Sequence, residues 1–379
     1  NTFQKGSYAH MKLVCSKANL LNGVQTVSKA VPSKTTMSIL ECILVDATNG
    51  EIKLTANDME LGIETTIEGQ IVEKGIIALD AKMFLEIVRK LPDSDITIET
   101  DASFKVVITC EKAKFTIIGK SGEDFSYLPA VEKDDSIVMS QFTLKEVVRQ
   151  TIFSISDNDN NKLMTGELFD INGEEFKIVS LDGHRISIRK IQLKNSYSPK
   201  KVVVPGKTLN EVSKILPGDA DSDVTISFTE KHIVFEFDKT VVVSRLIEGE
   251  YFKIDQMLSS DYETKVRVNK KEFLSCIDRA TLLVKEGDKK PIIVNITDSG
   301  MELKINSALG SMNEEIDIQK QGKDLMIGFN PKFLIDALRV IDDEEVDLYM
   351  VNPKAPCFIK NAEESYIYLI LPVNFTTVA

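Results

Sequence analysis

One pattern occurs three times in this chain, as LDAKMFLEIVRKLP (79–92), VPGKTLNEVSKILP (204–217) and FNPKFLIDALRVID (329–342). The lysines Lys82, Lys207 and Lys332 stand about 125 residues apart each time. Apolar residues follow each lysine with the spacing i, i+3 and i+7, the stripe of an amphipathic helix. This stripe consists of Phe84, Ile87 and Leu91, then Leu209, Val212 and Leu216, then Leu334, Ala337 and Ile341.

The length of the repeat predicts three copies of one domain. Solenoid repeats span roughly 20–50 residues, whereas about 125 residues is the size of an independent domain. We therefore expect domains at 11–131, 136–257 and 262–379. Residues 1–10 break the pattern before Met11, and we expect them to be a tag remnant.

Each repeat carries further elements around its helix. Short β-like runs precede the three helices (76–79, 202–204, 326–329) and follow them after an acidic turn (96–98, 224–226, 346–348). A second amphipathic helix opens each third, at 16–27, 143–155 and 269–283, with Lys17, Lys145 and Lys271 at equivalent points. Period-two alternation at 51–55 and 176–179 predicts half-buried antiparallel strands. The fold class predicted is α+β, with two helices on antiparallel sheets in each repeat.

The charge distribution is more informative than the net charge of −12, which comes from 46 basic and 58 acidic residues. An acidic balance ordinarily argues against nucleic-acid partners. Basic residues, however, lie on the expected helices away from the apolar stripes, and acids cluster in turns. Helices facing one way would make that face positive. Alternatively, cations such as Arg89, Lys90 and Lys214 complement the dipole at helix C-termini. Charge alone leaves both interpretations open.

The motifs of common enzymes are missing. The chain has no GxGxxG, GxxxxGK[ST] or HExxH. His184 stands in LDGHRISI (181–188), beside Asp182, which would suit acid–base work. The pair Asp182-Gly183 between alternating strands is also a tight-hairpin signal, and we favour this interpretation, which places His184 on a surface. We expect no catalysis, no cofactor and no metal site.

The cysteines and the hydropathy indicate the cellular compartment of the protein. Five scattered cysteines without a CxxC pair favour free thiols in a reducing cytoplasm over disulfides or zinc. No run of eighteen apolar residues is present, so no membrane span is expected.

Several segments, taken in order, resemble the bacterial β sliding clamp, the processivity factor of the replicative DNA polymerase. They are TTMSILECILVDATNGEIKLTANDMELGI (35–63), EDFSYLP (123–129), LMTGELFD (163–170), LDGHRISI, VVVPGK (202–207), SRLIEGEY (244–251), IGFNPKFL (327–334) and YLILPVN (368–374). The likeness covers residues 11–379. It implies a head-to-tail homodimer in which six domains close a ring around duplex DNA, with helices lining the hole and sheets outside.

The resemblance implies a sequence-independent DNA surface of basic residues facing phosphates. The residues expected there are Lys34, Lys82, Lys145, Arg149, Lys162, Lys207 and Lys332.

It also implies an apolar pocket between the second and third domains for short peptide motifs of the replicative polymerase, the clamp loader and repair proteins. The matching residues are Met164, Leu181, Gly183, His184, Arg185, Ile186, Phe252, Met257, Leu369, Leu371, Pro372 and Val373. Methionine and aliphatic side chains suit a plastic surface for many partners, and Arg185 is expected to bind a peptide carbonyl or amide. The alternative is that Ile186 and Leu371 are ordinary strand core.

The dimer interface implied by matching positions joins the first domain to the third domain of the partner. It comprises Lys112, Lys114, Phe115, Leu282, Leu283 and either Glu314 or Glu315. The chain also departs from the family pattern: Ser126 and Phe252 stand where proline is usual, Asn374 replaces a common arginine, and residues 375–379 extend past the usual end.

Two other classes of function compete with a DNA-encircling scaffold. One is a repeat-built scaffold that binds proteins without DNA. The other is an enzyme with its active site between repeats, which the missing acid–base and metal motifs disfavour. A monomer would fit either of these, and a dimer fits the ring.

Overall fold

The computed structural model describes residues 8, 10–132 and 135–375. Most of the expected tag and residues 376–379 of the C-terminal extension lie outside these ranges. The chain divides into two compact units. The first unit contains residues 1–142 and 210–246, and the second contains residues 143–209 and 247–379.

The first compact unit contains two antiparallel sheets beside helices α1 (Lys17–Ser28) and α2 (Ala81–Lys90). Its five-stranded sheet has the order β5 (Gln70–Glu73), β1 (Lys12–Ser16), β7 (Asp95–Thr100), β8 (Lys105–Cys110), β9 (Ala113–Ile118). Its eight-stranded sheet has the order β10 (Asp135–Ser140), β13 (Asp223–Phe228), β14 (His232–Phe237), β15 (Thr240–Arg245), β4 (Leu61–Ile67), β3 (Ile52–Asn57), β2 (Cys42–Asp46), β6 (Ile76–Asp80).

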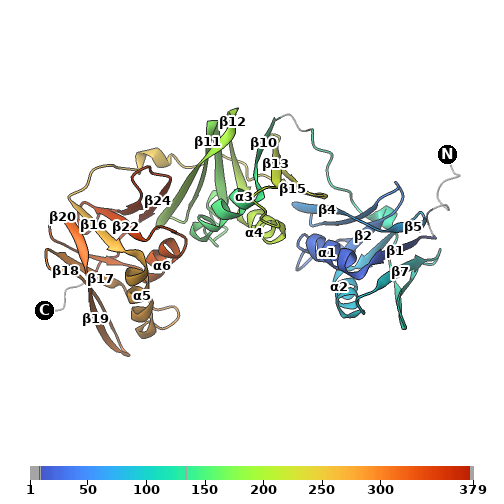
Figure 1. Ribbon diagram of the computed structural model, residues 1–379, viewed down its shortest axis with the longest axis horizontal. Coiled ribbons are helices and arrows are strands. Elements are labelled where there is room, and N and C mark those ends of the chain that lie inside the picture. Colours follow the sequence, from blue (N-terminus) through green and yellow to red (C-terminus); the bar gives the residue numbers. More distant parts are fainter. Residues whose placement is uncertain (1–7, 9, 133–134, 376–379) are drawn as a thin grey trace. The chain divides into compact units, whose positions relative to one another are not determined.

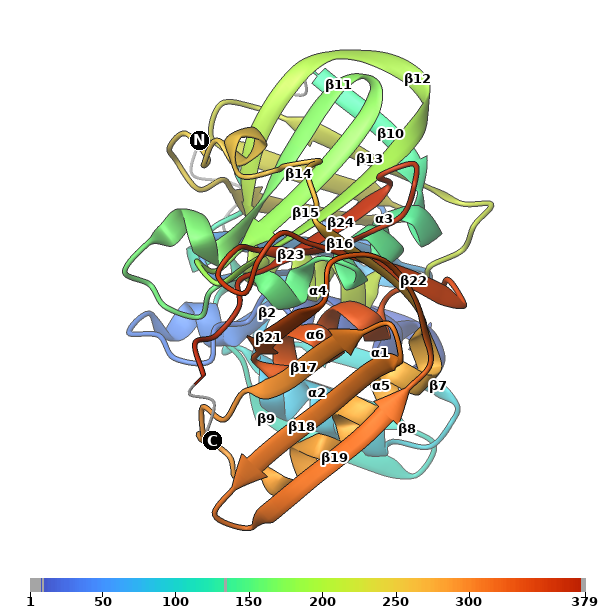
Figure 2. The ribbon, with the colours of Figure 1, turned by 90° about the vertical axis from the view of Figure 1, so that its left-hand side faces the viewer.

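The second compact unit is built in the same way, beside helices α5 (Lys270–Ala280) and α6 (Pro331–Arg339). Its seven-stranded sheet has the order β11 (Gly166–Leu181), β12 (Arg185–Pro205), β24 (Tyr366–Ile370), β23 (Cys357–Lys360), β22 (Glu345–Met350), β16 (Thr264–Asn269), β20 (Ile318–Gly322). Its four-stranded sheet has the order β19 (Gly310–Ile316), β18 (Gly300–Ser307), β17 (Ile292–Thr297), β21 (Leu325–Phe329). The long hairpin of β11 and β12 is seen beside β24 in Figure 2.

The repeated helices of the sequence are confirmed. They are α2, α4 (Gly206–Ile215) and α6, and each has its repeated lysine as the second helical residue. All nine residues of the predicted stripe are buried, with Ile87 the most exposed at 6%. The helices that open the repeats are α1, α3 (Gln141–Arg149) and α5. The divisions between the two compact units fall within α3 and α4.

The predicted register of these opening helices was wrong. Lys17 is the first residue of α1, but the first residues of α3 and α5 are Gln141 and Lys270 rather than Lys145 and Lys271. The backbone repeats in this corrected register, because each first residue donates its N–H to the turn before the next strand. The acceptors are the carbonyls of Ser94 at 3.2 Å, Ser222 at 2.8 Å and Glu344 at 2.9 Å, respectively.

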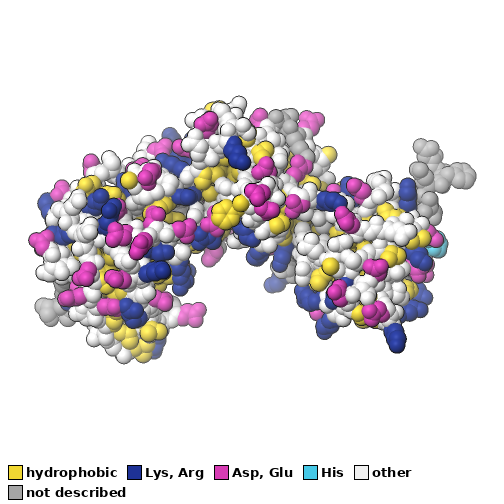
Figure 3. Space-filling view, viewed as in Figure 1, with side chains coloured by type: hydrophobic (Ala, Val, Ile, Leu, Met, Phe, Trp, Pro, Cys, Tyr) yellow, Lys and Arg dark blue, Asp and Glu magenta, His cyan; other side chains and the backbone are white. Residues whose placement is uncertain are grey.

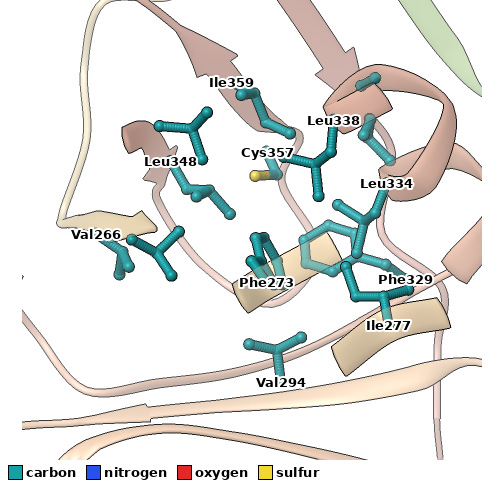
Figure 4. Packing of buried hydrophobic residues seen from close by; sticks show 14 of the residues in the cluster. Val266, Phe273, Ile277, Val294, Phe329, Leu334, Leu338, Leu348, Cys357 and Ile359 are labelled. Atoms are coloured by element: carbon teal, nitrogen blue, oxygen red, sulfur yellow. The ribbon is translucent and has the colours of Figure 1, made fainter. Parts of the chain in front are cut away.

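The third repeat shows how each core is filled. Figure 4 shows Phe273 and Ile277 of α5 facing Leu334 and Leu338 of α6, with strand residues such as Val294 packed around them. These side chains are fully or almost fully buried. Burial of aliphatic and aromatic side chains from both helices and both sheets stabilises the repeat, at about 25 cal/mol for each Å² of apolar surface.

Consecutive repeats are joined by strand pairing, which we call a seam. At the first seam, β15 of the second repeat pairs with β4 of the first over five residue pairs, from Thr240↔Thr65 to Ser244↔Leu61. At the second seam, β24 of the third repeat pairs with β12 of the second, also over five pairs (Figure 2). Each seam lies within one compact unit.

The strand order identifies the edges that remain. The first sheet of each repeat runs β1-β7-β8-β9, β10-β13-β14-β15 or β16-β22-β23-β24, so β9, β15 and β24 are equivalent. The second sheet runs β4-β3-β2-β6 in the first repeat and β19-β18-β17-β21 in the third, so β4 and β19 are equivalent. In the described part of the chain, β9 and β19 each have a neighbouring strand on one side alone.

None of the described helices has the length and apolar character needed to cross a membrane. The described residues also contain no cluster of histidine, cysteine and carboxylate side chains that would hold a metal ion.

Candidate functional site

A cavity of about 440 Å³, which we call the seam cavity, lies at the second seam. It brings together ten of the twelve residues predicted for the pocket. Its lining is Met164, Leu181, Gly183, His184, Arg185, Ile186, Phe252, Met257, Pro356, Leu369 and Leu371. Pro372 and Val373 line a neighbouring groove of about 910 Å³ instead. That the seam cavity binds peptides stays a prediction.

The turn between β11 and β12 shapes one wall of the seam cavity. The Oδ1 atom of Asp182 accepts hydrogen bonds from the backbone N–H groups of His184 at 2.9 Å and Arg185 at 3.1 Å. Gly183 adopts a φ of +89°, which a residue without Cβ tolerates. This tight turn leaves His184 exposed, as the hairpin signal predicted, and turns Ile186 inward beside Leu369, with which it pairs.

Arg185 is held by its own chain. Its guanidinium donates from Nε to Asp182 at 3.1 Å, from Nη1 to Asp336 of α6 at 2.7 Å, and from Nη2 to the carbonyl of Phe153 at 2.7 Å. It also lies 4.4 Å from the ring centre of Phe333. Three of the Arg185 donors are therefore already used within the chain, and the one that binds Asp336 ties the hairpin to α6. The expected hydrogen bond from Arg185 to a peptide would have to use another donor or replace one of these bonds.

His184 separates the seam cavity from the neighbouring groove and lines both. Its ring stacks on Phe333 with 6.2 Å between ring centres and 25° between planes. Its carbonyl accepts the N–H of Leu371 at 2.9 Å, which joins the C-terminal segment to the hairpin. The carboxylate of Asp182 accepts hydrogen bonds from backbone N–H groups and from Arg185. These bonds fix the turn that forms this wall of the seam cavity.

The segment between the second and third repeats supplies the outer rim of the seam cavity. Tyr251 is buried, and its ring meets Phe252 edge to face with 5.4 Å between centres. Phe252, which stands where proline is usual, lines the cavity together with Met257, which is 48% exposed. The departure from the family pattern thus places an aromatic side chain on the rim.

Leu371 and Ile186 differ in their burial. Ile186 is 6% exposed, as the interpretation of ordinary strand core requires, whereas Leu371 is 38% exposed. Both line the seam cavity. A large apolar side chain left exposed beside a cavity is available to a partner, so the strand-core alternative does not account for Leu371.

The C-terminal segment runs along β21. The N–H of Val373 donates to the carbonyl of Gly328 at 2.8 Å. A Cβ atom added to Gly328 would lie 2.8 Å from Cδ1 of Phe375, so the ring of Phe375 packs where glycine leaves room. Of the extension 375–379, the described Phe375 therefore packs on β21.

Pro356 lines the seam cavity but was not predicted. It lies in the turn before β23, far in sequence from the motifs that indicated the pocket. Its place depends on how β23 pairs with β24, and no local signal in the sequence marks it.

The basic residues predicted to face DNA differ in their surroundings. Lys34, Lys82, Lys162, Lys207 and Lys332 are exposed, and Lys145 is half-buried. Arg149 is exposed but donates to Glu146 of its own helix, from Nη2 at 2.8 Å and from Nε at 3.1 Å. That all seven face one surface stays a prediction.

Lysine is unfavourable where the repeat puts it. Lys82, Lys207 and Lys332 lie in the first turn of α2, α4 and α6, where the helix dipole is positive. None of these three first turns contains an acidic residue, although the N-cap residue of α2 is Asp80, whose carboxylate accepts the N–H of Met83. Complementing the dipole therefore explains Arg89, Lys90 and Lys214, which lie in last turns, but not the repeated lysines. Side chains cap two of these helices, since Asp80 accepts the N–H of Met83 and Asn330 accepts the N–H of Lys332. The exposed lysine side chains therefore remain as the groups that can meet an anion such as phosphate.

The residues predicted for the dimer interface lie at or near the two open edges. Lys114 and Phe115 are exposed on β9, and Lys112 precedes it. Leu282, in the 3₁₀ turn Thr281–Leu283, is 78% exposed, and nearby apolar side chains gather at the end of β19 in Figure 3. Of the two alternative acids on β19, Glu314 is paired with Arg279 of its own chain, and Glu315 is exposed.

Comparison with known proteins agrees with this architecture. Family models of the DNA polymerase III beta subunit match the chain three times, with the N-terminal domain at 11–129, the central domain at 138–253 and the C-terminal domain at 255–374. A beta sliding clamp of Staphylococcus aureus is 33% identical over 375 residues, which is 96% of this chain and 99% of the relative.

Solved structures give the same result. A DNA polymerase III beta subunit of Eubacterium rectale is 77% identical, with a TM-score of 0.94 over 96% of this chain and 100% of that one. The DNA polymerase sliding clamp of Bacillus subtilis is 33% identical, with a TM-score of 0.93 over 97% of this chain and 100% of that one. With three clamp domains and full-length relatives, the chain belongs to the DNA polymerase III beta subunit family, the non-catalytic sliding clamps that confer processivity in DNA replication.

Proposed function

We propose that two copies of this sliding clamp join head to tail, β9 of each copy pairing with β19 of the other. The observation that carries this proposal is the repeated seam. Strands equivalent to β9 and β4 meet twice within the chain, at β15·β4 and β24·β12. One strand of each kind is left over, and a second copy supplies the missing partner for both. Two seams of this kind close a ring of six domains.

The chemistry of the two open edges supports the pairing. Phe115 and Ile118 on β9 are 39% and 73% exposed, and Leu282 and Leu309 near β19 are 78% and 54% exposed. Lys112 and Lys114 offer positive charge on one side, and Glu315 offers negative charge on the other. Edge strands with exposed apolar residues are prone to uncontrolled pairing, which a specific partner prevents.

Sedimentation velocity tests the assembly directly. The chain has a mass of 42.3 kDa, and the proposal predicts a single species of twice that mass at micromolar concentration. A concentration-independent monomer would refute the ring and leave the alternative of a protein-binding scaffold.

We propose that the ring encloses duplex DNA without reading its sequence. Lys82, Lys207 and Lys332 support this, because each puts an exposed cation at the same point of its repeat, in the first turn of a helix. Lys34, Lys145, Arg149 and Lys162 complete the proposed surface. Phosphate contacts hold any sequence equally, so a closed ring slides while it keeps its polymerase on the template.

We propose that the seam cavity receives short peptide motifs of the replicative polymerase, the clamp loader and repair proteins. Its apolar lining, the exposed Leu371 and the flexible Met164 and Met257 support this use. Burial of two apolar anchors, each worth roughly 1.5–3 kcal/mol and offset by ordering of the peptide, gives an affinity on the order of micromolar. With these replication partners, the compartment that we propose for the protein is the cytoplasm.

Titration of a fluorescent peptide with Gln, Leu and Phe anchors tests the pocket. Met164→Ala should weaken binding severalfold, because a buried contact is lost. Unchanged affinity in this variant and in Met257→Ala would place the partner site elsewhere.

The domain boundaries 11–131, 136–257 and 262–379 are proposed with the same architecture, and limited proteolysis between them would test these limits.

A further inference from the structure

The groove beside the seam cavity has a different chemical character. It measures about 910 Å³ and shares His184 and Leu371 with the seam cavity, so the two lie side by side. Its walls are α6, the C-terminal segment and the loop 284–291. We call it the lysine groove, because Lys285, Lys289 and Lys290 of this loop and Lys332 of α6 line it.

The lysines of this groove lack acidic partners among the described residues. Two carboxylates of the groove are already used, since Asp336 binds Arg185 and Asp278 lies 3.9 Å from Arg339. The acids that remain are Glu286 and Asp288 of the loop. Four lysines therefore face two carboxylates, and all four lysines are exposed.

The loop that carries the lysines has a defined turn. The N–H of Asp288 donates to the carbonyl of Lys285 at 3.0 Å, and Gly287 adopts a φ of +86°. Lys289 and Lys290 follow this turn, and after Pro291 the chain enters β17, whose alternate residues are buried, so the loop is anchored to the sheet. The turn thus holds the positive charge of the lysines at the groove. This charged surface begins where the apolar surface of the seam cavity ends, at His184.

We propose that partner peptides carry acidic residues next to their apolar anchors, and that the lysine groove binds them. This inference rests on the proposed function of the seam cavity. The anchors fill the seam cavity, the chain passes His184 and Leu371, and carboxylates reach Lys285, Lys289 and Lys290. At about 3.3 Å for each extended residue, three residues beyond the anchors span roughly 10 Å.

The test compares three fluorescent peptides with the same anchors. One has neutral flanks of Asn and Gln, one has Asp-Glu-Asp before the anchors, and one has Asp-Glu-Asp after them. We expect one of the two acidic peptides to bind about tenfold tighter than the neutral peptide at low salt, as a few exposed ion pairs allow. The advantage should shrink as salt screens the charges.

The variant Lys285→Gln/Lys289→Gln/Lys290→Gln should remove this advantage and leave the neutral peptide unchanged. The matched control is Lys194→Gln/Lys200→Gln/Lys201→Gln, which removes equal charge from a part of β12 that lines neither the seam cavity nor the lysine groove. The control should keep the full advantage of the acidic peptide.

Three results would overturn the proposal. Equal affinity of all three peptides would show that the groove does not select charge. An equal loss of advantage in the control would show a general effect of net charge. Loss of binding to a fluorescent DNA duplex in the groove variant, with peptide binding unchanged, would assign these lysines to DNA.

The same titrations distinguish failure of the seam cavity from failure of the lysine groove. If no peptide binds, the seam cavity itself fails as the partner site and this inference falls with it. If the neutral peptide binds and the acidic peptides bind no tighter, the lysine groove alone is refuted.

Discussion

The two seams of this chain pair their strands alike but differ in the residues placed on them. At the first seam Gly62 pairs with Val243, and a methyl of Leu128 lies where a side chain on Gly62 would be. At the equivalent point of the second seam Ile186 pairs with Leu369, and both line the seam cavity. The same strand pairing thus joins consecutive repeats at both seams. At the first seam the chain's own Leu128 covers the paired strands, whereas at the second seam the paired residues line an open cavity.

The open edges β9 and β19 extend this comparison to the third seam that we propose between copies. Replacement of both Leu282 and Leu283 by Asp should give folded monomers, because two charges would be buried without partners at the proposed junction. Sedimentation velocity with a circular dichroism spectrum checks both properties. Val72→Asp, on β5 at the opposite edge of the five-stranded sheet, is the matched control and should remain dimeric. A dimeric leucine variant would mean that the third seam is misplaced.

The helix N-termini test whether the repeats share one DNA surface. Replacement of Lys82, Lys207 and Lys332 by Gln should weaken binding to all duplexes alike. The slope of log affinity against log salt should fall by about 0.9 for each phosphate contact removed. Titrations at several salt concentrations measure it, with Lys194→Gln/Lys200→Gln/Lys201→Gln as control. A loss confined to some sequences, or an unchanged slope, would contradict the proposed surface.

Equivalent residues at the two seams separate stability from peptide binding. Leu369→Ala and Val243→Ala each remove a buried apolar group, so both should lower the free energy of unfolding. Leu369→Ala should also weaken the anchor peptide by roughly 1–2 kcal/mol, about five- to thirtyfold. Val243→Ala should leave peptide affinity unchanged. Equal effects of both variants on peptide binding would remove the distinction between the seams.

One buried carboxyl group distinguishes the second repeat from the others. In each repeat, one strand residue pairs with the residue that lies two positions before the repeated helix. These equivalent residues are Ile43, Glu167 and Ile292, and all three side chains are buried. Burial raises the pKa of Glu167 to about 8, although the hydroxyl of Thr151 lies 2.7 Å from its Oε2 atom. The folded chain therefore keeps a proton that the unfolded chain loses near pH 4.5.

Because the folded pKa is raised, Glu167 costs no stability below the unfolded pKa, and stability falls as pH rises from about 4.5 to 8. Glu167→Gln should raise the unfolding temperature by a few degrees at pH 7.5, an effect on the order of 2 kcal/mol, and have little effect at pH 4.5. Thermal scans at both pH values measure this difference. The same shift at both would show that ionisation is not responsible.

The sequence predicted the six long helices, and strand-like runs in eight of the described strands, because their periodicity is local. The stripe of Phe84, Ile87 and Leu91 lies within a single helix, so its spacing alone indicates which face is buried. The corresponding residues of the other two repeats are buried in the same way. The register of the opening helices was misjudged, because Lys145 matches Lys17 in local sequence. The junction with the preceding strand, which decides the register, places Gln141 there instead.

The candidate site was predictable in part. Motif resemblance indicated ten of the residues that line the seam cavity, but not Pro356. Nor did it indicate that Arg185 is tied to Asp336, since these residues lie 151 positions apart in sequence. The lysine groove likewise forms from a loop, a helix and the C-terminal segment that only the fold brings together.

The central claim, that two copies close a ring around DNA, is tested most directly by covalent closure. In the variant Lys114→Cys/Glu315→Cys a short bismaleimide should link the two junctions. The five native cysteines are buried, so we expect the reagent to spare them. Burial raises the pKa of the thiols of Cys15, Cys276 and Cys357 to about 12.

The variant is mixed with circular plasmid, cross-linked, and passed over a sizing column in about 1 M salt, which screens phosphate contacts. The account predicts that cross-linked dimers elute with the circular plasmid and are released when the plasmid is cut once. Dimers that leave the intact circle, or that stay on the cut DNA, would contradict the ring.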